Sequence, residues 1–234
     1  MSYTFSGEGP GVQTPDGCSV SLYRDLPYMG ELEEVIDQFR PGDAVLELGC
    51  GTGRLCALIA ELGCETAGVD ESPEMLACLP TQVRGVRAKI EDLALGQTFD
   101  TVLLASHLIN HPDAQIRETF VRAARRHLGV GGRFLVQRHS VDWLESVEVG
   151  QVGRAGRCTV GVEAVVREVD AIHLTLRYGL DGRTWRQSFT TTSLREPDIE
   201  ALLLRCGFVG MRWHGSQKLW VEAVACPCEP VVAT

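Results

Sequence analysis

The sequence has little lysine, few aromatic residues and no cluster of basic side chains. Two of its 234 residues are lysine, Lys89 and Lys218, and aromatic residues make up 6% of the chain. The formal net charge is −9 at pH 7. A chain with this charge repels phosphate backbones, so its composition argues against a nucleic-acid partner.

Long apolar runs are also missing. No stretch approaches the ~20 apolar residues that a membrane helix needs, and the first ten residues lack the basic and apolar regions of a signal peptide. Nine scattered cysteines, an odd number, are typical of reduced thiols. Cys226 and Cys228 have no second Cys/His pair nearby, so we expect no metal site. We therefore expect a cytoplasmic protein without a membrane partner.

The chain is long enough for one buried domain, residues 1–234, and short for two. Residues 1–20 are rich in Gly, Ser, Thr and Pro and are expected to be flexible. Beyond them, short apolar runs alternate with segments of helical spacing, which indicates parallel βαβ units. The expected strands are 44–48, 65–69, 83–88, 99–105 and 134–137, with a turn at 129–132; the expected helices are 30–39, 54–62, one starting at Ser72, and 113–128.

The pattern changes after the fifth strand. Residues 160–191 alternate with period two, and Asp181-Gly182 is a strong hairpin signal, which predicts an antiparallel insertion at about 141–192. A helix at 194–206 capped by Ser193 and a closing hairpin of 208–213 with 219–225 follow. The predicted fold is therefore α/β: a doubly wound, Rossmann-like seven-stranded sheet with a terminal antiparallel hairpin and an antiparallel insertion after the fifth strand.

The most informative motif is the run Val-Leu-Glu-Leu-Gly-Cys-Gly-Thr-Gly, which ends at Gly53, with Asp70 closing the next apolar run. A strand that enters a glycine-rich turn and a helix builds a crevice of backbone N–H groups, and an acid on the next strand can hold a ribose diol. Arg54 stands where a dinucleotide fingerprint has its third glycine. Glu47 would repel a pyrophosphate and suits a cationic ligand.

This segment resembles the first motif of the class I S-adenosylmethionine-dependent methyltransferases, an acidic residue followed by x and G-x-G-x-G. The resemblance covers residues 23–225 and implies S-adenosyl-L-methionine as cofactor and S-adenosyl-L-homocysteine as product. It implies that Glu47 supports the ammonium group and that Asp70 accepts both ribose hydroxyls. The other positions that it implies for the cofactor are Tyr23, Gly49, Cys50, Gly51, Gly53, Glu71, Met75, Glu91, Asp92 and Ser106, of which Asp92 matches the adenine amino group better than Glu91.

Methyl transfer from a sulfonium depends mainly on alignment, and a base matters only for a protonated nucleophile. His111, just beyond the fourth strand, is the first candidate base, and His107 is the second. His139, Tyr23 and Tyr28 come next. The alternative for His111, which precedes Pro112, is that it caps or orients the next helix.

The insertion suggests the acceptor, since it would overhang the carboxyl ends of the sheet. Trp143, Trp185, Trp213 and Tyr178 are candidates for an aromatic pocket or for core packing. We expect methyl transfer to an O, N or S nucleophile of a small or medium-sized metabolite, including a peptide natural product, in bacterial antibiotic biosynthesis. Two alternatives stay open: an NAD-dependent oxidoreductase, and a non-catalytic module that binds the cofactor. The acceptor and the oligomeric state are not predicted.

Overall fold

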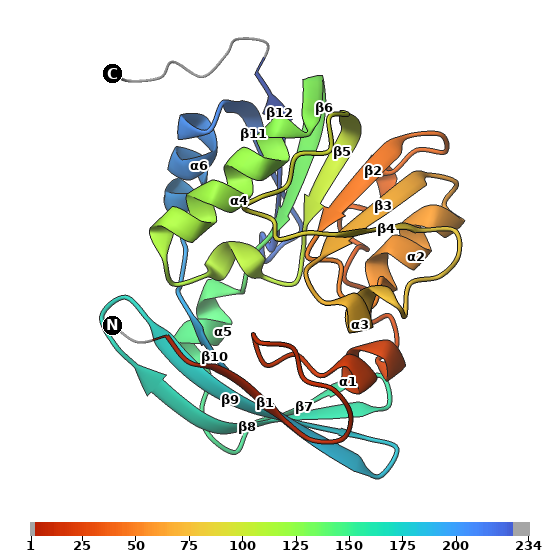
Figure 1. Ribbon diagram of the computed structural model, residues 1–234. Coiled ribbons are helices and arrows are strands. Elements are labelled where there is room, and N and C mark those ends of the chain that lie inside the picture. The colour runs from red at the N-terminus through yellow and green to blue at the C-terminus, as the bar shows by residue number, and fades with distance from the viewer. Residues whose placement is uncertain (1–2, 227–234) are drawn as a thin grey trace.

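The computed structural model describes residues 3–226, so Pro227 and Cys228 lie outside the described residues. Figure 1 shows a larger α/β layer above a smaller curved sheet. None of the helices in residues 3–226 combines the length and the apolar character needed to span a bilayer.

The larger sheet has seven strands in the order β11-β12-β6-β5-β2-β3-β4. Strands β4, β3, β2, β5 and β6 run parallel, while β12 and β11 form an antiparallel pair at one edge. This topology confirms the predicted seven-stranded doubly wound sheet with its terminal hairpin. The bounds are β2 Ala44–Leu48, β3 Glu65–Asp70, β4 Arg84–Arg87, β5 Phe99–Leu104, β6 Leu128–Gln137, β11 Phe208–His214 and β12 Trp220–Ala225.

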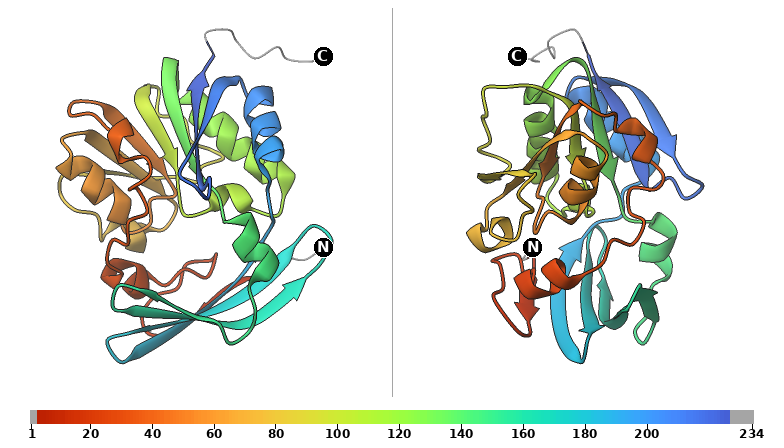
Figure 2. Two further views of the ribbon diagram at one scale, coloured as in Figure 1. Left: turned by 180° about the vertical axis from the view of Figure 1, so that it is seen from behind. Right: turned by 90° about the vertical axis from the view of Figure 1, so that its right-hand side faces the viewer.

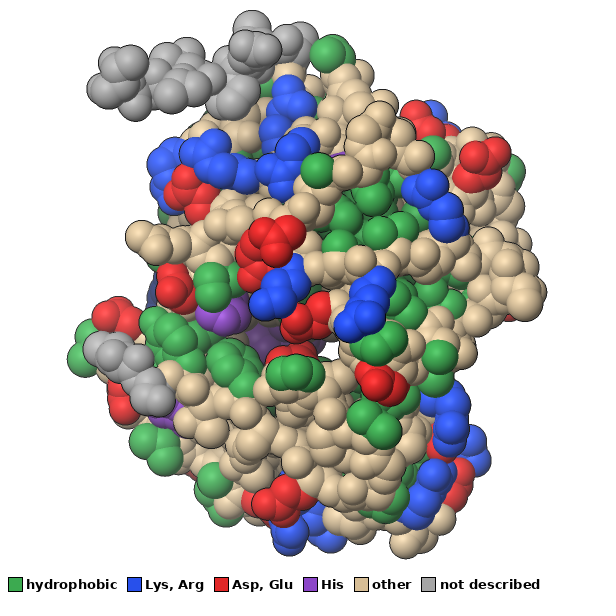
Figure 3. Space-filling view, in the orientation of Figure 1, with side chains coloured by type: hydrophobic (Ala, Val, Ile, Leu, Met, Phe, Trp, Pro, Cys, Tyr) green, Lys and Arg blue, Asp and Glu red, His purple; other side chains and the backbone are tan. Residues whose placement is uncertain are grey.

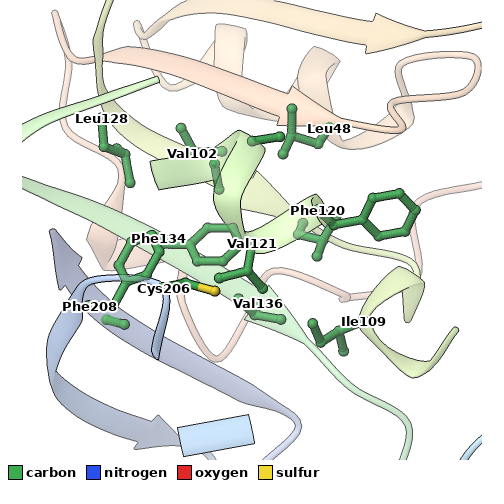
Figure 4. Close-up of a cluster of buried hydrophobic side chains, with 14 of the residues drawn as sticks. Leu48, Val102, Ile109, Phe120, Val121, Leu128, Phe134, Val136, Cys206 and Phe208 are labelled. Carbon is green, nitrogen blue, oxygen red and sulfur yellow. The ribbon is translucent and has the colours of Figure 1, made fainter. Parts of the chain in front are cut away.

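Helices cover both faces of this sheet because its strands are apolar on both sides. On one face, Leu46 and Leu48 pack with α4 and α6, around Phe120, Val121 and Phe134 (Figure 4). On the other face, Val45 packs against α2. The bounds are α2 Arg54–Glu61, α3 Pro73–Leu76, α4 Ala114–Arg126, α5 Val141–Ser146 and α6 Glu196–Arg205, with the 3-10 helices η1 Ile36–Gln38 and η2 Leu108–Asn110.

The smaller sheet has five antiparallel strands in the order β1-β10-β9-β8-β7. Both views in Figure 2 show it lying across the end of the larger sheet. Strands β7 to β10 and α5 make up the segment expected as an insertion. Their bounds are β7 Val152–Ala155, β8 Cys158–Arg167, β9 Ile172–Leu180 and β10 Arg183–Thr191, and the chain enters through β1 Phe5–Glu8 and α1 Val20–Asp25.

Strand β1 lies in the segment of residues 1–20, where the sequence pattern indicates no strand. Phe5 pairs with Phe189 of β10, and the backbone N–H of Thr4 donates to Oγ1 of Thr190 at 2.9 Å. The first described residues therefore complete the edge of the smaller sheet.

Three local predictions are wrong. The expected helix 30–39 is a run of turns closed by i→i+3 hydrogen bonds that ends in η1, although Leu32 and Val35 are buried as the pattern requires. The expected turn at 129–132 belongs to β6, where Leu128 pairs with Phe99. Helix α6 has Arg195 as N-cap in place of Ser193, because Pro197 sets its first turn.

Candidate active site

A cavity of about 860 Å³ lies between the carboxyl ends of the parallel strands and the smaller sheet. Its walls come from the turns after β2, β3, β5 and β6 on one side and from β1, β9 and β10 on the other. Figure 3 shows the hollow in this face of the molecule, with histidine side chains inside it. The volume lies in the upper part of the ~300–1,000 Å³ range of ligand pockets, which suits two small ligands side by side.

The glycine turn after β2 forms one end of the cavity. Gly49, Gly51 and Gly53 have φ values of 71°, 55° and 80°, a region that L side chains rarely adopt. A Cβ on Gly49 would lie 2.5 Å from Leu108, whereas one on Gly51 would point into space, with Sδ of Met75 its nearest neighbour at 4.0 Å. Gly51 therefore leaves room for a ligand, while Gly49 lets the chain pass close to η2.

Asp70 lies at the end of β3, beside this turn. One carboxylate oxygen accepts from the backbone N–H of Gly51 and the other from that of Ser72, both at 2.9 Å. Burial raises the pKa of Asp70, and these N–H donors oppose the rise. Each oxygen keeps a second lone pair, so the carboxylate can accept two further hydrogen bonds from a diol.

Glu47 is buried on β2 and also lines the cavity. Its Oε2 accepts from the thiol of Cys56 at 2.9 Å, and burial raises its pKa to about 7. Arg54, the nearest cation that affects it, forms an ion pair with Glu31 instead. A buried carboxylate without its own cation favours a positively charged ligand group, as an ammonium would supply.

Most of the other positions that the resemblance implies also reach the cavity, and two do not. Gly53 is the N-cap of α2 and packs under Leu79, outside the lining. Asp92 is exposed, also outside it, so Glu91 is the acid that the structure places beside the cavity. Those that line the cavity are Tyr23, Cys50, Glu71, Met75, Glu91 and Ser106.

His111 lines the cavity at the end of η2, and its ring stacks on Phe5 with centroids 5.7 Å apart. Its Nδ1 accepts the backbone N–H of Asp113 at 3.1 Å. Because an accepting nitrogen carries no proton, the neutral ring holds its proton on Nε2 and offers only a donor there. This contact makes His111 a poor general base. It also supports the alternative, that the ring orients the start of α4.

His107 and His139 form a second group. Their rings stack with centroids 3.9 Å apart, and both line the cavity. Burial lowers the pKa of His107 to about 4 and lowers that of His139 as well, so both rings are neutral at pH 7. Nδ1 of His107 is buried without a hydrogen-bond partner. Ser106 and His107 both have positive φ, a strained backbone that is common at functional sites.

Two of the four candidate aromatic residues line the cavity, namely Trp143 on α5 and Tyr178 on β9. Trp185 is buried beside α1 and donates to the carbonyl of Pro10. Trp213, on the edge strand β11, donates to Glu200 of α6 and lies outside the lining. Tyr28 lies outside the lining, where its hydroxyl accepts from the N–H of Leu32.

Sequence reasoning missed the contribution of the N-terminal arm, residues 14–18. Thr14, Asp16 and Cys18 line the cavity, and Gln187 of β10 connects the arm to Tyr23 by donating to Cys18 and accepting from the Tyr23 hydroxyl. No local motif marks these residues, since they reach the site through contacts with a distant strand, such as the hydrogen bond from Gln187 to Cys18.

The site fits S-adenosylmethionine in three respects: Gly51 leaves space for a ligand, Asp70 has lone pairs for a ribose diol, and Glu47 lacks a cation. Comparison with known proteins supports the same cofactor. The family described as "Methyltransferase domain" matches residues 45–132, which include the glycine turn and Asp70. Residues 45–132 are a class I methyltransferase domain. The predicted family and the predicted cofactor are thereby confirmed for this domain, and the nicotinamide alternative is disfavoured.

Two curated relatives match over part of their length. The cypemycin N-terminal methyltransferase of Streptomyces sp is 32% identical over 105 residues, covering 42% of this chain and 43% of the relative. The ubiquinone biosynthesis O-methyltransferase of Xanthomonas euvesicatoria pv. vesicatoria is 34% identical over 104 residues, covering 41% of this chain and 42% of the relative. The chain thus spans less than half the length of these relatives.

Solved structures match over most of the chain. An S-adenosylmethionine-bound amino pentose methyltransferase of calicheamicin biosynthesis from Micromonospora echinaspora has a TM-score of 0.67 at 22% identity and covers 87% of this chain and 94% of its own. The glycopeptide N-methyltransferase MtfA, complexed with S-adenosyl-L-homocysteine, has a TM-score of 0.56 at 26% identity. The match covers 92% of this chain and 99% of MtfA. The likeness to the first shows a shared fold.

Proposed function

We propose that the chain transfers a methyl group from S-adenosylmethionine to an O, N or S nucleophile of a small or medium-sized metabolite in bacterial natural-product biosynthesis. The observation that carries the proposal is one cavity with two different halves. The glycine turn, Glu47 and Asp70 form the first half, and the rings of His139 and Trp143 lie in the second.

The bound cofactor would supply an electrophilic methyl group. The residues of the chain would hold it by its two ends, with the Glu47 carboxylate at the ammonium group and the Asp70 carboxylate at the ribose. The arm with Asp16 and Cys18 would exclude water from the mouth. Fixing two reactants in line contributes up to ~7–11 kcal/mol in well-oriented systems, so this alignment can supply most of the acceleration.

The names of the relatives support a small acceptor and leave its nucleophile open. They include an N-terminal methyltransferase, an O-methyltransferase and an amino pentose methyltransferase. The cytoplasmic location and the lack of a nucleic-acid partner stay predictions from the sequence.

The test is a thermal-shift titration of the whole chain with S-adenosyl-L-homocysteine and, in parallel, with NADH. A ligand that binds only the native state stabilises it by ~2.7 kcal/mol at 100 times its dissociation constant. For a chain of this size that corresponds to a rise of several degrees in Tm. Stabilisation by NADH alone, or by neither, contradicts the proposal; stabilisation by S-adenosyl-L-homocysteine without turnover of any acceptor favours the non-catalytic module.

A further inference from the structure

The second half of the cavity is lined by two groups of rings, which together are called the ring wall. Trp143 stacks near His139 with centroids 5.6 Å apart, and His139 lies parallel to Phe189 at 6.3 Å. Phe189 pairs directly across the strands with Phe5, whose ring stacks on His111 at 5.7 Å. Side chains of directly paired residues lie ~4.5–5.5 Å apart at Cβ, so the two groups of rings are neighbours on the same side of the smaller sheet.

The wall itself contains no Asp, Glu, Lys or Arg, and the charged residue of the lining whose field reaches it is Glu91, beside His111. The charged side chains that line the cavity belong to β2, to α2, to the end of β3, to the loop after β4 and to the N-terminal arm; they are Asp16, Glu47, Arg54, Asp70, Glu71, Lys89 and Glu91. Among the described residues, the ring wall and the strands behind it add no Asp, Glu, Lys or Arg to the lining. A charged acceptor would lose its hydration there without gaining a partner.

Most polar side chains near the wall are already engaged with the protein. Asn110 donates to the carbonyl of Thr192 and accepts from the N–H of His139. Ser140 accepts from the N–H of Trp143. His111, by contrast, keeps an Nε2–H donor that no described residue accepts, and this donor suits an oxygen of a bound ring.

From these observations we infer that the acceptor is an uncharged aromatic ring that carries a hydroxyl group, held flat against the wall formed by Trp143, His139, Phe189, Phe5 and His111. This inference rests on the proposed function and narrows its acceptor class. Flat rings gain affinity from stacking beyond the area that they bury, whereas an amino sugar has no π face and carries an ammonium group.

The reaction then balances without a further reagent. The hydroxyl oxygen forms the new O–C bond to the methyl carbon, and the C–S bond breaks with its electron pair on sulfur. The hydroxyl proton passes to water, because burial keeps the pKa of the neighbouring His139 well below its usual range.

The test compares three ligands that share one ring and differ in charge, together with an amino sugar. Calorimetric titrations use the protein saturated with S-adenosyl-L-homocysteine and four probes: 4-methylcatechol, dopamine, 3,4-dihydroxybenzoate and glucosamine. We expect 4-methylcatechol to bind at least about tenfold more tightly than either charged analogue, because each of those brings an ion without a partner. Tighter binding of dopamine or glucosamine, or no binding of 4-methylcatechol, overturns the inference.

Variants show whether the probe occupies the wall. Trp143→Leu and Phe189→Leu should each weaken 4-methylcatechol roughly 3–10-fold, the effect of one lost ring contact, and leave the affinity for S-adenosyl-L-homocysteine unchanged. Arg186→Ala is the matched control, since Arg186 lies next to Gln187 on β10 and pairs with Glu163 at the surface. Equal effects from the control contradict the inference. Failure of S-adenosyl-L-homocysteine to bind contradicts the proposed function instead, so the two failures are distinguishable.

Discussion

The backbone N–H of Asp113 donates to Nδ1 of His111 at 3.1 Å, and this contact fixes which nitrogen of the ring carries the proton. The sequence indicates His111 as the first candidate base from its position after the fourth strand. The structure keeps it at the cavity and gives it the properties of a hydrogen-bond donor. Position in the chain therefore predicts that the ring lies at the site, while its local hydrogen bond decides its chemistry.

Replacing His111 tests this role. For any acceptor that the chain methylates, His111→Ala should raise KM roughly tenfold, the cost of one hydrogen bond, and leave the pH profile of kcat unchanged. His111→Asn, which keeps an N–H donor, should restore part of the affinity. Nitrogen-15 NMR of the imidazole should show the proton on Nε2. A kcat profile that loses its fall at low pH in His111→Ala would restore His111 as the base.

Asp70→Asn should lower the affinity for S-adenosyl-L-homocysteine by on the order of 10–100-fold, because hydrogen bonds to a charged group contribute about 1.5–3 kcal/mol. The fold should persist, since an amide oxygen still accepts one of the two backbone N–H groups that Asp70 holds. Calorimetry measures the affinity, and circular dichroism checks the fold. Exposed Asp92, changed to Asn in the same way, is the control, and an equal loss there would mean that the ribose is misplaced.

The raised pKa of Glu47 predicts how stability and cofactor binding depend on pH. Its pKa is about 7 in the fold against an ordinary 4.5, so between these values the native state holds a proton that the unfolded chain has lost. The free energy of unfolding from this group therefore falls as the pH rises through 4.5–7. A cationic ligand favours the ionised carboxylate, so affinity for S-adenosyl-L-homocysteine should rise over the same interval.

Glu47→Gln should remove both trends, because the amide does not titrate. Urea unfolding and calorimetry at pH 5, 6, 7 and 8 measure them. An unchanged pH dependence of binding in Glu47→Gln would show that another group holds the ammonium group of the ligand. Cys56→Ala is the control, because it removes only the thiol that donates to Glu47.

Two serine caps allow the halves of the cavity to be disturbed separately. Ser72 accepts from the N–H of Met75 at the start of α3, and Ser140 accepts from that of Trp143 at the start of α5. Each change to alanine should cost ~1 kcal/mol of stability, or about 2–4 °C in Tm for a chain of this size. Ser72→Ala should weaken the binding of S-adenosyl-L-homocysteine, and Ser140→Ala should weaken the binding of 4-methylcatechol. Identical ligand effects from both would contradict the division of the cavity.

Local sequence signals predicted the cofactor half well. The glycine turn, Asp70 and the cap at Ser72 act within a few residues of one another, so their geometry follows from short-range sterics and hydrogen bonds. The expected helix 30–39 is wrong because its apolar spacing also fits a run of 3-10 turns, and burial of Leu32 satisfies either form.

The acceptor half was less predictable, since its residues meet through pairings far apart in the chain. Which tryptophans reach the cavity depends on how α5 and the smaller sheet fold over it, so Trp143 lines the site and Trp213 does not. Phe5 joins the ring wall only because β1 pairs with β10. No local pattern marks such a residue.

The pairing of β1 with β10 also has a consequence for the order of folding. Thr4 and Thr190 are hydrogen-bonded across 186 positions of sequence. During synthesis β1 has no partner until β10 has been made, and contacts this distant in sequence form slowly. The parallel strands β2 to β6, which carry the glycine turn and Asp70, can pair before β10 joins β1. A refolding chain should therefore regain the ability to bind the cofactor before it can hold an acceptor.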